Sequence, residues 1–570
     1  MLICLLLFIS HCLAETPVVE TPYGKVRGFS HTTLSGNEVN VYLGIPYAQA
    51  PEGDLRFEKP VLVKKWDQEL ELGTKFGLAC HVFYRTTIIS NRNYSENCLT
   101  VGVVTPSKKA ANLPVLAFIH GGGFAVGDAE MGGYKRIAEH FVSKGIVFVT
   151  IQYRLGFLGK SFQSLVNSFV LGFLSSEDGS IPGNLGLWDQ TLALKFIREI
   201  LPSFGGDPNR ITLMGQSAGS ACVSALLASP QSNNLFNQAI ELSGSVLGLG
   251  YGDRIKTVTS QLAAAINCEE KGNTSLKDCL KSKTIEDFYN AMDVVGGGIS
   301  HPQFIYMHPV PDKDFFPEPI DQLFAKAPKK RTIQGVTDDE AAIFTYQINV
   351  KGVSYLYIPE EKRKDFGYKD LEKFVDAFIT KEEFGAKAAS LKSAIMDFYG
   401  NKTDDTPYFY AQAFTDLISD NVFTLPAYRE IELKSQSGWE TFAYIMDNPR
   451  SKESNPILRD LPILMEHFGL ENIPLSERDN VFQNAVISTF VAFIKTGTPS
   501  TDSIKWEPAT KQNFEKHLVL SSHPKMAETL YRREAYQLWF ETIPSIVDPK
   551  ILKKLLIPGV QLTDPPKSEL

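Results

Sequence analysis

The chain has 570 residues, of which 43% are hydrophobic, so it can bury a large core. Its formal net charge is −8 and no basic stripe stands out in the sequence, which argues against a nucleic-acid partner. The short basic clusters at 329–331 and 362–364 are interpreted as solvated surface.

The amino-terminal segment resembles a targeting sequence. Residues 2–13 are nearly all apolar, and small residues stand at Cys12 and Ala14, the −3 and −1 positions of a cleavage site. This pattern predicts a secretory signal peptide over residues 1–14, too short to cross a bilayer. No other apolar run has the length of a transmembrane helix, so we expect no membrane span.

Apolar runs and helix-like stretches alternate along the chain. The runs 115–119 and 146–151 are continuously apolar, which predicts strands that are buried on both faces. Helix-like stretches lie at 134–144 and 188–201. The alternation predicts an α/β protein with a large, mostly parallel central sheet flanked by helices.

The remaining organisation indicates one catalytic domain over residues 15–550. Residues 15–60 carry short strand-like runs broken by glycine and proline. Residues 360–435 are richer in helix formers, and we expect them to pack over the carboxyl edge of the sheet. No repeat or low-complexity tract marks a domain boundary, and residues 551–570 form a C-terminal tail.

The most informative motif is the G-x-S-x-G sequence at 215–219, with Ser217 at its centre. Residues 210–214 before it indicate a buried strand, and residues 220–227 after it indicate a helix. A strand, a glycine-flanked serine and a helix predict a nucleophile elbow. The glycines leave room for a sharp turn, and the serine is expected in a strained backbone conformation.

A second motif, the run of three glycines at 121–123, directly follows the predicted strand 115–119. Consecutive glycines imply that backbone must approach another group closely. We expect the N–H groups of Gly122 and Gly123 to join that of Ala218 in an oxyanion hole. The alternative is a flexible glycine turn.

The cysteine count agrees with an oxidising compartment. Five of the seven cysteines remain after removal of the signal peptide, which predicts two disulfides and one free thiol. Pairing neighbours gives Cys80–Cys98 and Cys268–Cys279. Cys222 is then left as a small buried hydrophobe.

Glycosylation and sorting signals fit the same route. Asn93, Asn273 and Asn401 each begin an N-x-S/T sequon. The last four residues, Lys-Ser-Glu-Leu at 567–570, differ at one position from a K-D-E-L retention signal. We therefore expect the lumen of the endoplasmic reticulum, with secretion as the alternative.

Together these motifs resemble the type-B carboxylesterases, the α/β-hydrolase group that includes cholinesterases, and particularly the gut-esterase type. The resemblance covers almost the whole mature chain and implies an α/β-hydrolase fold. It also implies the two disulfides named above and an ion pair between Arg56 and Glu96. The further segments that carry it are 42–48, 55–57, 95–99, 152–156, 183–190 and 204–208.

The resemblance also implies the acid of a catalytic triad. The family pattern G-x-x-x-D-E-G matches residues 335–341, so Glu340 corresponds to the acid that orients the base. Ala341 stands where the family has glycine. Asp338 and Asp339 are expected to be solvated.

The catalytic histidine is missing from its expected position. The family's H-G-x-E-L-P-Y-like segment corresponds to residues 457–463, and Ile457 occupies the place of the base. His467 lies nearest and is the candidate base, which would have to come near 3 Å of the serine oxygen. The alternative is an ordinary helix histidine, because the family pattern places this position in the following helix and not in the active-site loop. Less suitable histidines stand near a late strand or before the glutamate: His517, His523, His301 and His308.

A second departure from the family pattern is an apolar insertion at residues 160–172. An apolar insertion beside a core strand is hard to bury and looks like a retained intron. The missing histidine is then either a true loss of catalysis or an artefact of splice prediction, and the sequence leaves both open.

We expect a serine carboxylic-ester hydrolase of broad specificity that acts on small-molecule esters. Cholinesterases need a tryptophan in the first disulfide loop, but between Cys80 and Cys98 the aromatic residues are Phe83, Tyr84 and Tyr94. No metal-ligand spacing or phosphate-binding loop is seen, so no cofactor is implied. The competing class is a catalytically impaired, esterase-like binding protein.

Overall fold

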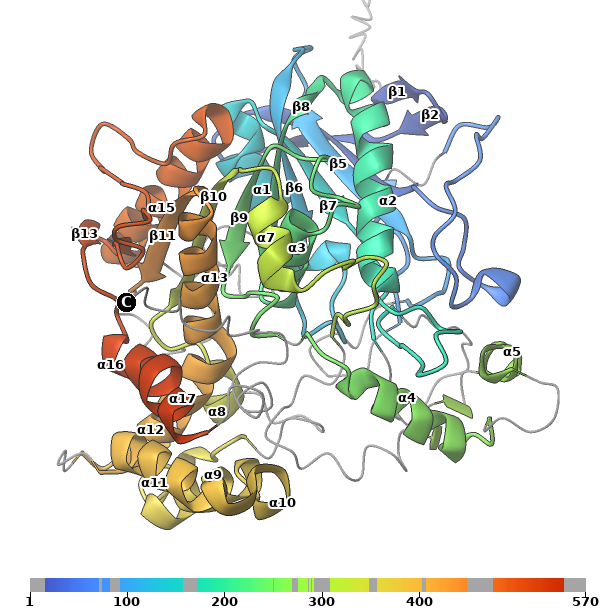
Figure 1. Ribbon diagram of the computed structural model, residues 1–570. Coiled ribbons are helices and arrows are strands. Elements are labelled where there is room, and N and C mark those ends of the chain that lie inside the picture. Colours follow the sequence, from blue (N-terminus) through green and yellow to red (C-terminus); the bar gives the residue numbers. More distant parts are fainter. Residues whose placement is uncertain are drawn as a thin grey trace, which may run out of the picture.

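The fold is seen in a computed structural model that describes residues 16–70, 74–81, 93–156, 172–249, 251–268, 275–284, 287–288, 290–291, 308–347, 356–401, 406–447 and 475–547. The described residues form an 11-stranded sheet in the order β13-β12-β11-β10-β9-β8-β6-β7-β5-β4-β3, and β1 and β2 form a separate hairpin (Figure 1). The strands are β1 Val18–Thr21, β2 Gly24–Arg27, β3 Phe29–Thr32, β4 Glu38–Pro46, β5 Thr100–Pro106, β6 Leu113–Ile119, β7 Val147–Ile151, β8 Gly206–Gln216, β9 Gln238–Leu242, β10 Arg331–Thr337, β11 Glu440–Met446, β12 His517–Leu520 and β13 Lys525–Ala527.

The centre of the sheet is parallel. Neighbouring strands are parallel from β7 through β6, β8, β9, β10 and β11 to β12, whereas the pairs at both ends of the sheet are antiparallel. This confirms the predicted mostly parallel α/β sheet. It also brings the carboxyl ends of β8, β9, β10 and β11 to one edge, where sites of open α/β sheets form.

Helices cover both faces of the sheet. Strand β6 shows why, because Val115, Ala117 and Ile119 enter one apolar core while Leu116 and Phe118 enter the other. The first core packs under α2, α3, α7 and α13, and the second under α1 and α15 (Figure 1). The helices are α1 Lys135–His140, α2 Leu185–Ile200, α3 Ala218–Ala228, α4 Arg254–Ala265, α5 Leu276–Ser282, α7 Ile320–Lys326, α8 Ala342–Tyr346, α9 Tyr368–Phe378, α10 Lys381–Phe384, α11 Ala388–Tyr399, α12 Phe409–Ser419, α13 Leu425–Gln436, α15 Glu477–Thr496, α16 Arg533–Gln537 and α17 Ile543–Ile546.

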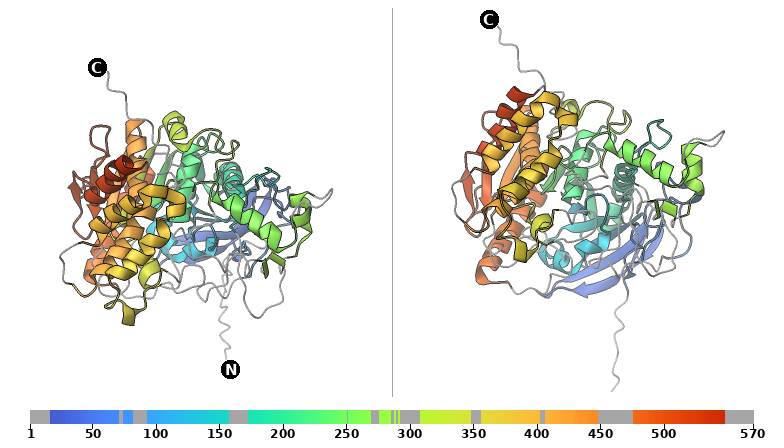
Figure 2. Two further views of the ribbon diagram at one scale, coloured as in Figure 1. Left: turned by 60° about the horizontal axis from the view of Figure 1, so that its bottom comes forward. Right: turned by 90° about the horizontal axis from the view of Figure 1, so that it is seen from below.

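The helix-rich segment 360–435 is divided between two places. Helices α9 to α12 gather beyond the carboxyl ends of the strands, as expected (Figures 1 and 2). Helix α12 contacts that edge directly, because Ser419 Oγ accepts a hydrogen bond from the Ala341 N–H at 2.9 Å. Helix α13 instead returns along the sheet and packs against β10 and β11.

Two helix boundaries differ from the sequence prediction. The stretch 134–144 is broken at Phe141, where α1 gives way to a short 3₁₀ turn. Helix α2 begins at Leu185 rather than at 188, because Asn184 adopts a left-handed conformation with φ 53°. The Asn184 side chain holds this turn by bonding both the N–H and the carbonyl of Val310.

The covalent and ionic links confirm several expectations. Cys80 is bonded to Cys98 and Cys268 to Cys279, which are the predicted pairs. Cys222 is free and buried. The Arg56 guanidinium donates to both carboxylate oxygens of Glu96 at 2.7 and 2.9 Å, as the family resemblance implies. The disulfides suggest a protein that resides outside the cytoplasm.

A buried ion pair joins the end of β7 to α2. Arg154 Nε and Nη2 each lie 2.7 Å from the Asp189 carboxylate, and their side chains are 2% and 0% exposed. The Arg154 N–H also donates to Asp189 at 3.0 Å, so one carboxylate serves both the side chain and the backbone of the arginine.

Several sequence predictions fall outside the described residues. These are the signal peptide 1–14, the tail 551–570, Asn273 and all of the insertion 160–172 except Gly172. Gly172 itself donates its N–H to Leu155 at 2.6 Å and accepts one from Gly186 at 2.8 Å.

Replacing Asp189 by asparagine should lower the free energy of unfolding by about 3–5 kcal/mol, because the Arg154 charge would stay buried without its counter-charge. Urea denaturation measures the loss. The matched control is Glu318→Gln in the exposed pair with Lys326, which should change stability by about 0.5 kcal/mol or less. Equal effects of the two substitutions would contradict the account of this pair.

Candidate active site

Ser217 lies in the sharp turn between β8 and α3. Its backbone angles are φ 55° and ψ −125°, a conformation that non-glycine residues rarely adopt. The flanking glycines are required by close contacts. A Cβ atom on Gly215 would lie 2.2 Å from the Gly219 carbonyl oxygen, and one on Gly219 would lie 2.2 Å from that of Ile119. The predicted strand, strained serine and helix are therefore present in this order.

The peptide groups of Ser217 are held from β9 and the residues after it. The Ser217 N–H donates to the Leu242 carbonyl at 2.8 Å. Gly244 packs so closely that a Cβ atom there would lie 2.2 Å from the Ser217 carbonyl oxygen. The Gly244 carbonyl in turn accepts a hydrogen bond from Ser220 Oγ at 2.7 Å.

The glycine loop lies against the same turn. A Cβ atom on Gly121 would be 2.5 Å from the Gln216 carbonyl oxygen and 3.1 Å from the Ser217 Cβ. Gly122 and Gly123 have φ 110° and 63°, which favour glycine. Ala218 is the first residue of α3, so its N–H has no partner within the helix. The structure thus brings the glycine loop, through Gly121, against the elbow from which α3 begins.

His120 supports this loop from the protein interior. Its ring is 1% exposed and stacks on Tyr153 with centroids 4.5 Å apart. Its Nδ1 faces the Gly121 carbonyl at 2.9 Å, and the Tyr153 hydroxyl donates to the His120 carbonyl at 2.8 Å. Burial lowers the pKa of His120, so the ring is a neutral part of the packing.

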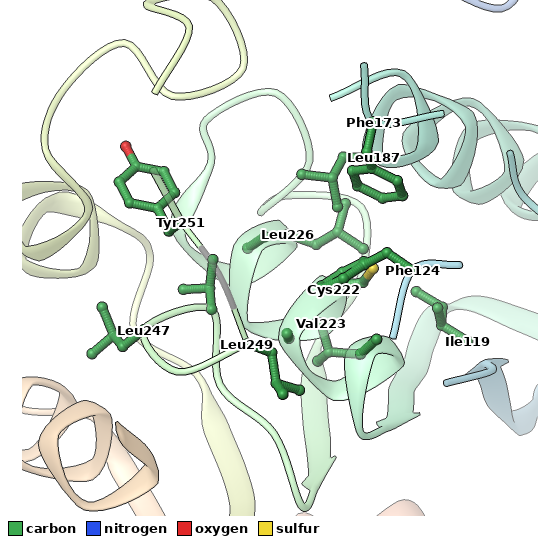
Figure 3. Close-up of a cluster of buried hydrophobic side chains, with 14 of the residues drawn as sticks. Ile119, Phe124, Phe173, Leu187, Cys222, Val223, Leu226, Leu247, Leu249 and Tyr251 are labelled. Atoms are coloured by element: carbon green, nitrogen blue, oxygen red, sulfur yellow. The ribbon is translucent and has the colours of Figure 1, made fainter. Parts of the chain in front are cut away.

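Apolar side chains surround the elbow helix. Figure 3 shows Cys222, Val223 and Leu226 of α3 beside Phe124 of the glycine loop. The Phe124 ring meets Phe173 at 5.0 Å between centroids, and both are fully buried. The glycine loop and the elbow are therefore fixed to one hydrophobic core.

Glu340 lies in the turn after β10, at the same sheet edge as Ser217. Gln216 of β8 is in register with Leu242 of β9, which is in register with Gly335 of β10. Since β8 and β10 are two strands apart, their ends are separated by roughly 10 Å. One Glu340 carboxylate oxygen accepts the Thr337 N–H at 2.6 Å, which fixes the turn.

The departure from the family pattern at Ala341 is compatible with this turn. Ala341 has φ −81°, so its backbone needs no glycine, and its side chain is fully buried. Alanine at this position therefore leaves the placement of Glu340 intact.

The segment that should supply the base follows β11. Strand β11 pairs with β10 in parallel, with Met446 opposite Thr337, so the chain leaves it at the edge that holds Glu340. Residues 448–474 lie outside the described residues, and both Ile457 and His467 fall in this range.

Two of the histidines considered from the sequence are excluded by position. His517 stands at the amino end of β12, on the opposite edge of the sheet from Ser217. His523 is exposed and follows β12, which is four strands from β8, or roughly 19 Å. His308 is buried with its Nδ1 at 3.0 Å from the Pro309 carbonyl, and His301 lies outside the described residues.

The first disulfide loop is described only in part. Tyr94 lies beside His81 with ring centroids 5.7 Å apart, whereas Phe83 and Tyr84 lie outside the described residues.

Across the described ranges, no three His, Cys, Asp or Glu side chains are grouped in a way that could hold a metal ion. Within the same ranges, no helix has the length and hydropathy needed to cross a membrane.

Sequence reasoning missed the segment after β9. Ser243 has φ 55° and donates its N–H to the Gly335 carbonyl at 2.9 Å, so it links the ends of β9 and β10. The run Ser243-Gly244-Ser245 directly after an apolar strand was the available signal, because small residues after a strand indicate close packing at the sheet edge.

The sequence of the whole chain agrees with this geometry. Residues 15–539 match the carboxylesterase family. The chain is 31% identical to gut esterase 1 of Caenorhabditis elegans over 563 residues, which are 94% of each chain. It is 28% identical to mouse cholinesterase and to mouse carboxylesterase 3B, over 96% and 93% of this chain and 90% of each relative.

This protein belongs to the carboxylesterase family, and its sheet and helices form the α/β-hydrolase fold of that family. Family membership suggests a serine ester hydrolase.

Replacing Gly244 by alanine should destabilise the protein by about 2 kcal/mol or more, because the new methyl group meets the Ser217 carbonyl, which cannot move freely. The midpoint of urea unfolding is the measurement. Gly367→Ala is the control, since its Cβ atom would meet its nearest neighbour at 3.8 Å. A Gly244→Ala variant as stable as this control would show that the elbow is not tightly held.

Proposed function

We propose that this chain is a serine carboxylic-ester hydrolase of broad specificity, with Ser217 as the nucleophile. The observation that carries the proposal is the strained conformation of Ser217 at a strand-to-helix turn, with the glycine loop packed against it. We further propose that residues 15–550 act as one catalytic domain, because Ser217 and Glu340 leave strands of a single sheet.

In the first step, Ser217 Oγ attacks the carbonyl carbon of the ester. The N–H groups of Gly122, Gly123 and Ala218 stabilise the negative oxygen that develops. The Oγ proton passes through a base to the alcohol oxygen, the carbon–alkoxy bond breaks, and the acyl group remains on Ser217. Water then attacks the acyl-enzyme and releases the carboxylic acid.

Glu340 is proposed as the acid that orients the base and stabilises its charged form. Its carboxylate is fixed by the Thr337 N–H at the edge where the segment after β11 begins. His467 is the candidate base on that segment. The proposed substrates are small-molecule esters, and the reaction requires no cofactor.

We also propose that the chain enters the secretory pathway. The two disulfides support this, as do Asn93 and Asn401, which begin sequons and are exposed. Within the pathway we propose the endoplasmic reticulum lumen, based on the Lys-Ser-Glu-Leu tail, with secretion as the alternative.

The second candidate function is that of an esterase-like protein which binds a ligand without turning it over. The observation that favours it is Ile457 at the place of the family's base. Without a base, the Ser217 hydroxyl keeps a pKa far above neutral and is a poor nucleophile.

A fluorophosphonate should label the purified chain covalently, and Ser217→Ala should abolish the labelling, because the probe reacts with activated serine hydroxyls. Intact mass spectrometry measures the adduct. Ser232→Ala is the control, since it removes another buried serine hydroxyl, which is bonded to the Leu226 carbonyl. A folded chain that stays unlabelled would favour the binding protein.

If His467 is the base, His467→Ala should slow the labelling by about 10²–10⁴-fold, the usual contribution of general-base catalysis. The control is His523→Ala, which should label at the rate of the unmodified chain because His523 stands far along the sheet. Equal labelling rates for the two variants would assign the base to another residue.

A further inference from the structure

A charged cluster is buried between the sheet and α13, away from the groups assigned to catalysis. The Lys434 ammonium of α13 contacts the carboxyl group of Glu241 of β9 and that of Glu430, one helical turn earlier. All three side chains are 0% exposed, and Lys434 Nζ lies 2.6 Å from the Glu430 carboxylate. Lys434 also donates to the Gln334 side chain of β10 at 3.1 Å.

The cluster contains two carboxyl groups and one ammonium group. The ammonium group can balance the charge of only one carboxylate, so the two carboxyl groups differ in pKa. Burial, followed by the neighbouring Glu430 carboxylate, raises the pKa of Glu241 well above its usual range. Burial also acts to raise the pKa of Glu430, but the Lys434 charge and the hydrogen bonds outweigh it and lower that pKa. Burial therefore favours the neutral form of Glu241, whereas Lys434 favours the charged form of Glu430.

Glu430 accepts hydrogen bonds from two serine hydroxyls, which belong to the segments that hold Ser217. One carboxylate oxygen accepts hydrogen bonds from Ser224 of α3, at 2.8 Å, and from Ser245 after β9. The Ser224 hydroxyl also accepts the Val246 N–H at 3.2 Å. Ser224 lies on the helix that begins at Ser217, and Ser245 follows Gly244, which packs on the Ser217 carbonyl.

A buried ion pair is a weak source of stability, because apolar side chains of similar volume stabilise a core as well or better. Apolar side chains cannot, however, provide directional hydrogen bonds to two hydroxyls on different segments. The distinctive contribution of the cluster is therefore geometric.

We propose that Glu430 is a positioning residue for Ser217, because its carboxylate ties α3 to the segment after β9 and so fixes the two pieces of backbone that hold the elbow. This inference rests on the proposed role of Ser217 as the nucleophile. Lys434 keeps the Glu430 carboxylate charged in the core, and Glu241 and Gln334 accept further hydrogen bonds from the ammonium group.

Four variants test this proposal. Glu430→Gln removes the charge from the acceptor, and Ser245→Ala removes one of the two links while leaving the cluster in place. Glu241→Gln is the control for the first, because it makes the same change of carboxyl to amide at a group that neither serine hydroxyl contacts in the described hydrogen bonds. Ser232→Ala is the control for the second, because it deletes a buried hydroxyl bonded to Leu226 instead.

The first measurement is fluorophosphonate inactivation, resolved into the affinity constant KI and the maximal rate kinact. Glu430→Gln and Ser245→Ala should lower kinact by about 10- to 100-fold with KI within about twofold, because misplacing a nucleophile slows the reaction more than it weakens binding. Both controls should stay within about twofold. An unchanged kinact in Ser245→Ala would overturn the proposal.

The second measurement, hydrogen exchange by mass spectrometry, does not depend on activity. Peptides from 214–227 and 242–249 should exchange about tenfold faster in Glu430→Gln and Ser245→Ala than in the controls. Unchanged exchange would overturn the proposal, and if Glu430→Gln does not fold, Ser245→Ala decides. A wild-type chain that the fluorophosphonate does not label would contradict the proposed function, and exchange would still decide the role of Glu430.

Discussion

The backbone conformation of Ser217 is the constraint on which the rest of the site depends. A non-glycine residue at φ 55° and ψ −125° costs about 1–3 kcal/mol and persists only where its surroundings enforce it. Here β9 holds its N–H, Gly244 packs on its carbonyl, and Gly219 lets backbone from β6 approach. The strained turn places Ser217 at the carboxyl edge of the sheet, beside the glycine loop.

Two kinds of interaction enforce the backbone conformation of Ser217. Apolar burial around α3 supplies the free energy, because its residues contribute fully buried side chains to the core beneath the glycine loop (Figure 3). The hydrogen bonds from Ser224 and Ser245 to Glu430 supply direction, since they fix two segments relative to each other. Packing alone would allow those segments to slide, whereas charged acceptors with defined donors restrict them to one arrangement.

Local patterns in the sequence predicted the elements that depend on local physics. The apolar runs gave the central strands, and the motif around Ser217 gave the elbow with its positive φ. The start of α2 was missed, because it depends on hydrogen bonds from Asn184 to a residue 126 positions away. The Glu430–Lys434–Glu241 cluster was missed for the same reason, since Glu241 and Lys434 are 193 positions apart and only the fold brings them together. The family resemblance predicted Glu340 as the acid. Its distance of two strands from Ser217 follows only from the register of β8, β9 and β10 in the sheet.

The most direct test of Ser217 as an acylated nucleophile is to trap the acyl-enzyme itself. The chain would be mixed with p-nitrophenyl acetate, quenched in acid within the first turnover, digested and analysed by mass spectrometry. If Ser217 is the nucleophile, one acetyl group per chain is expected, on the peptide that contains Ser217. An acetyl group on a different residue, or none in a folded chain, would contradict this role.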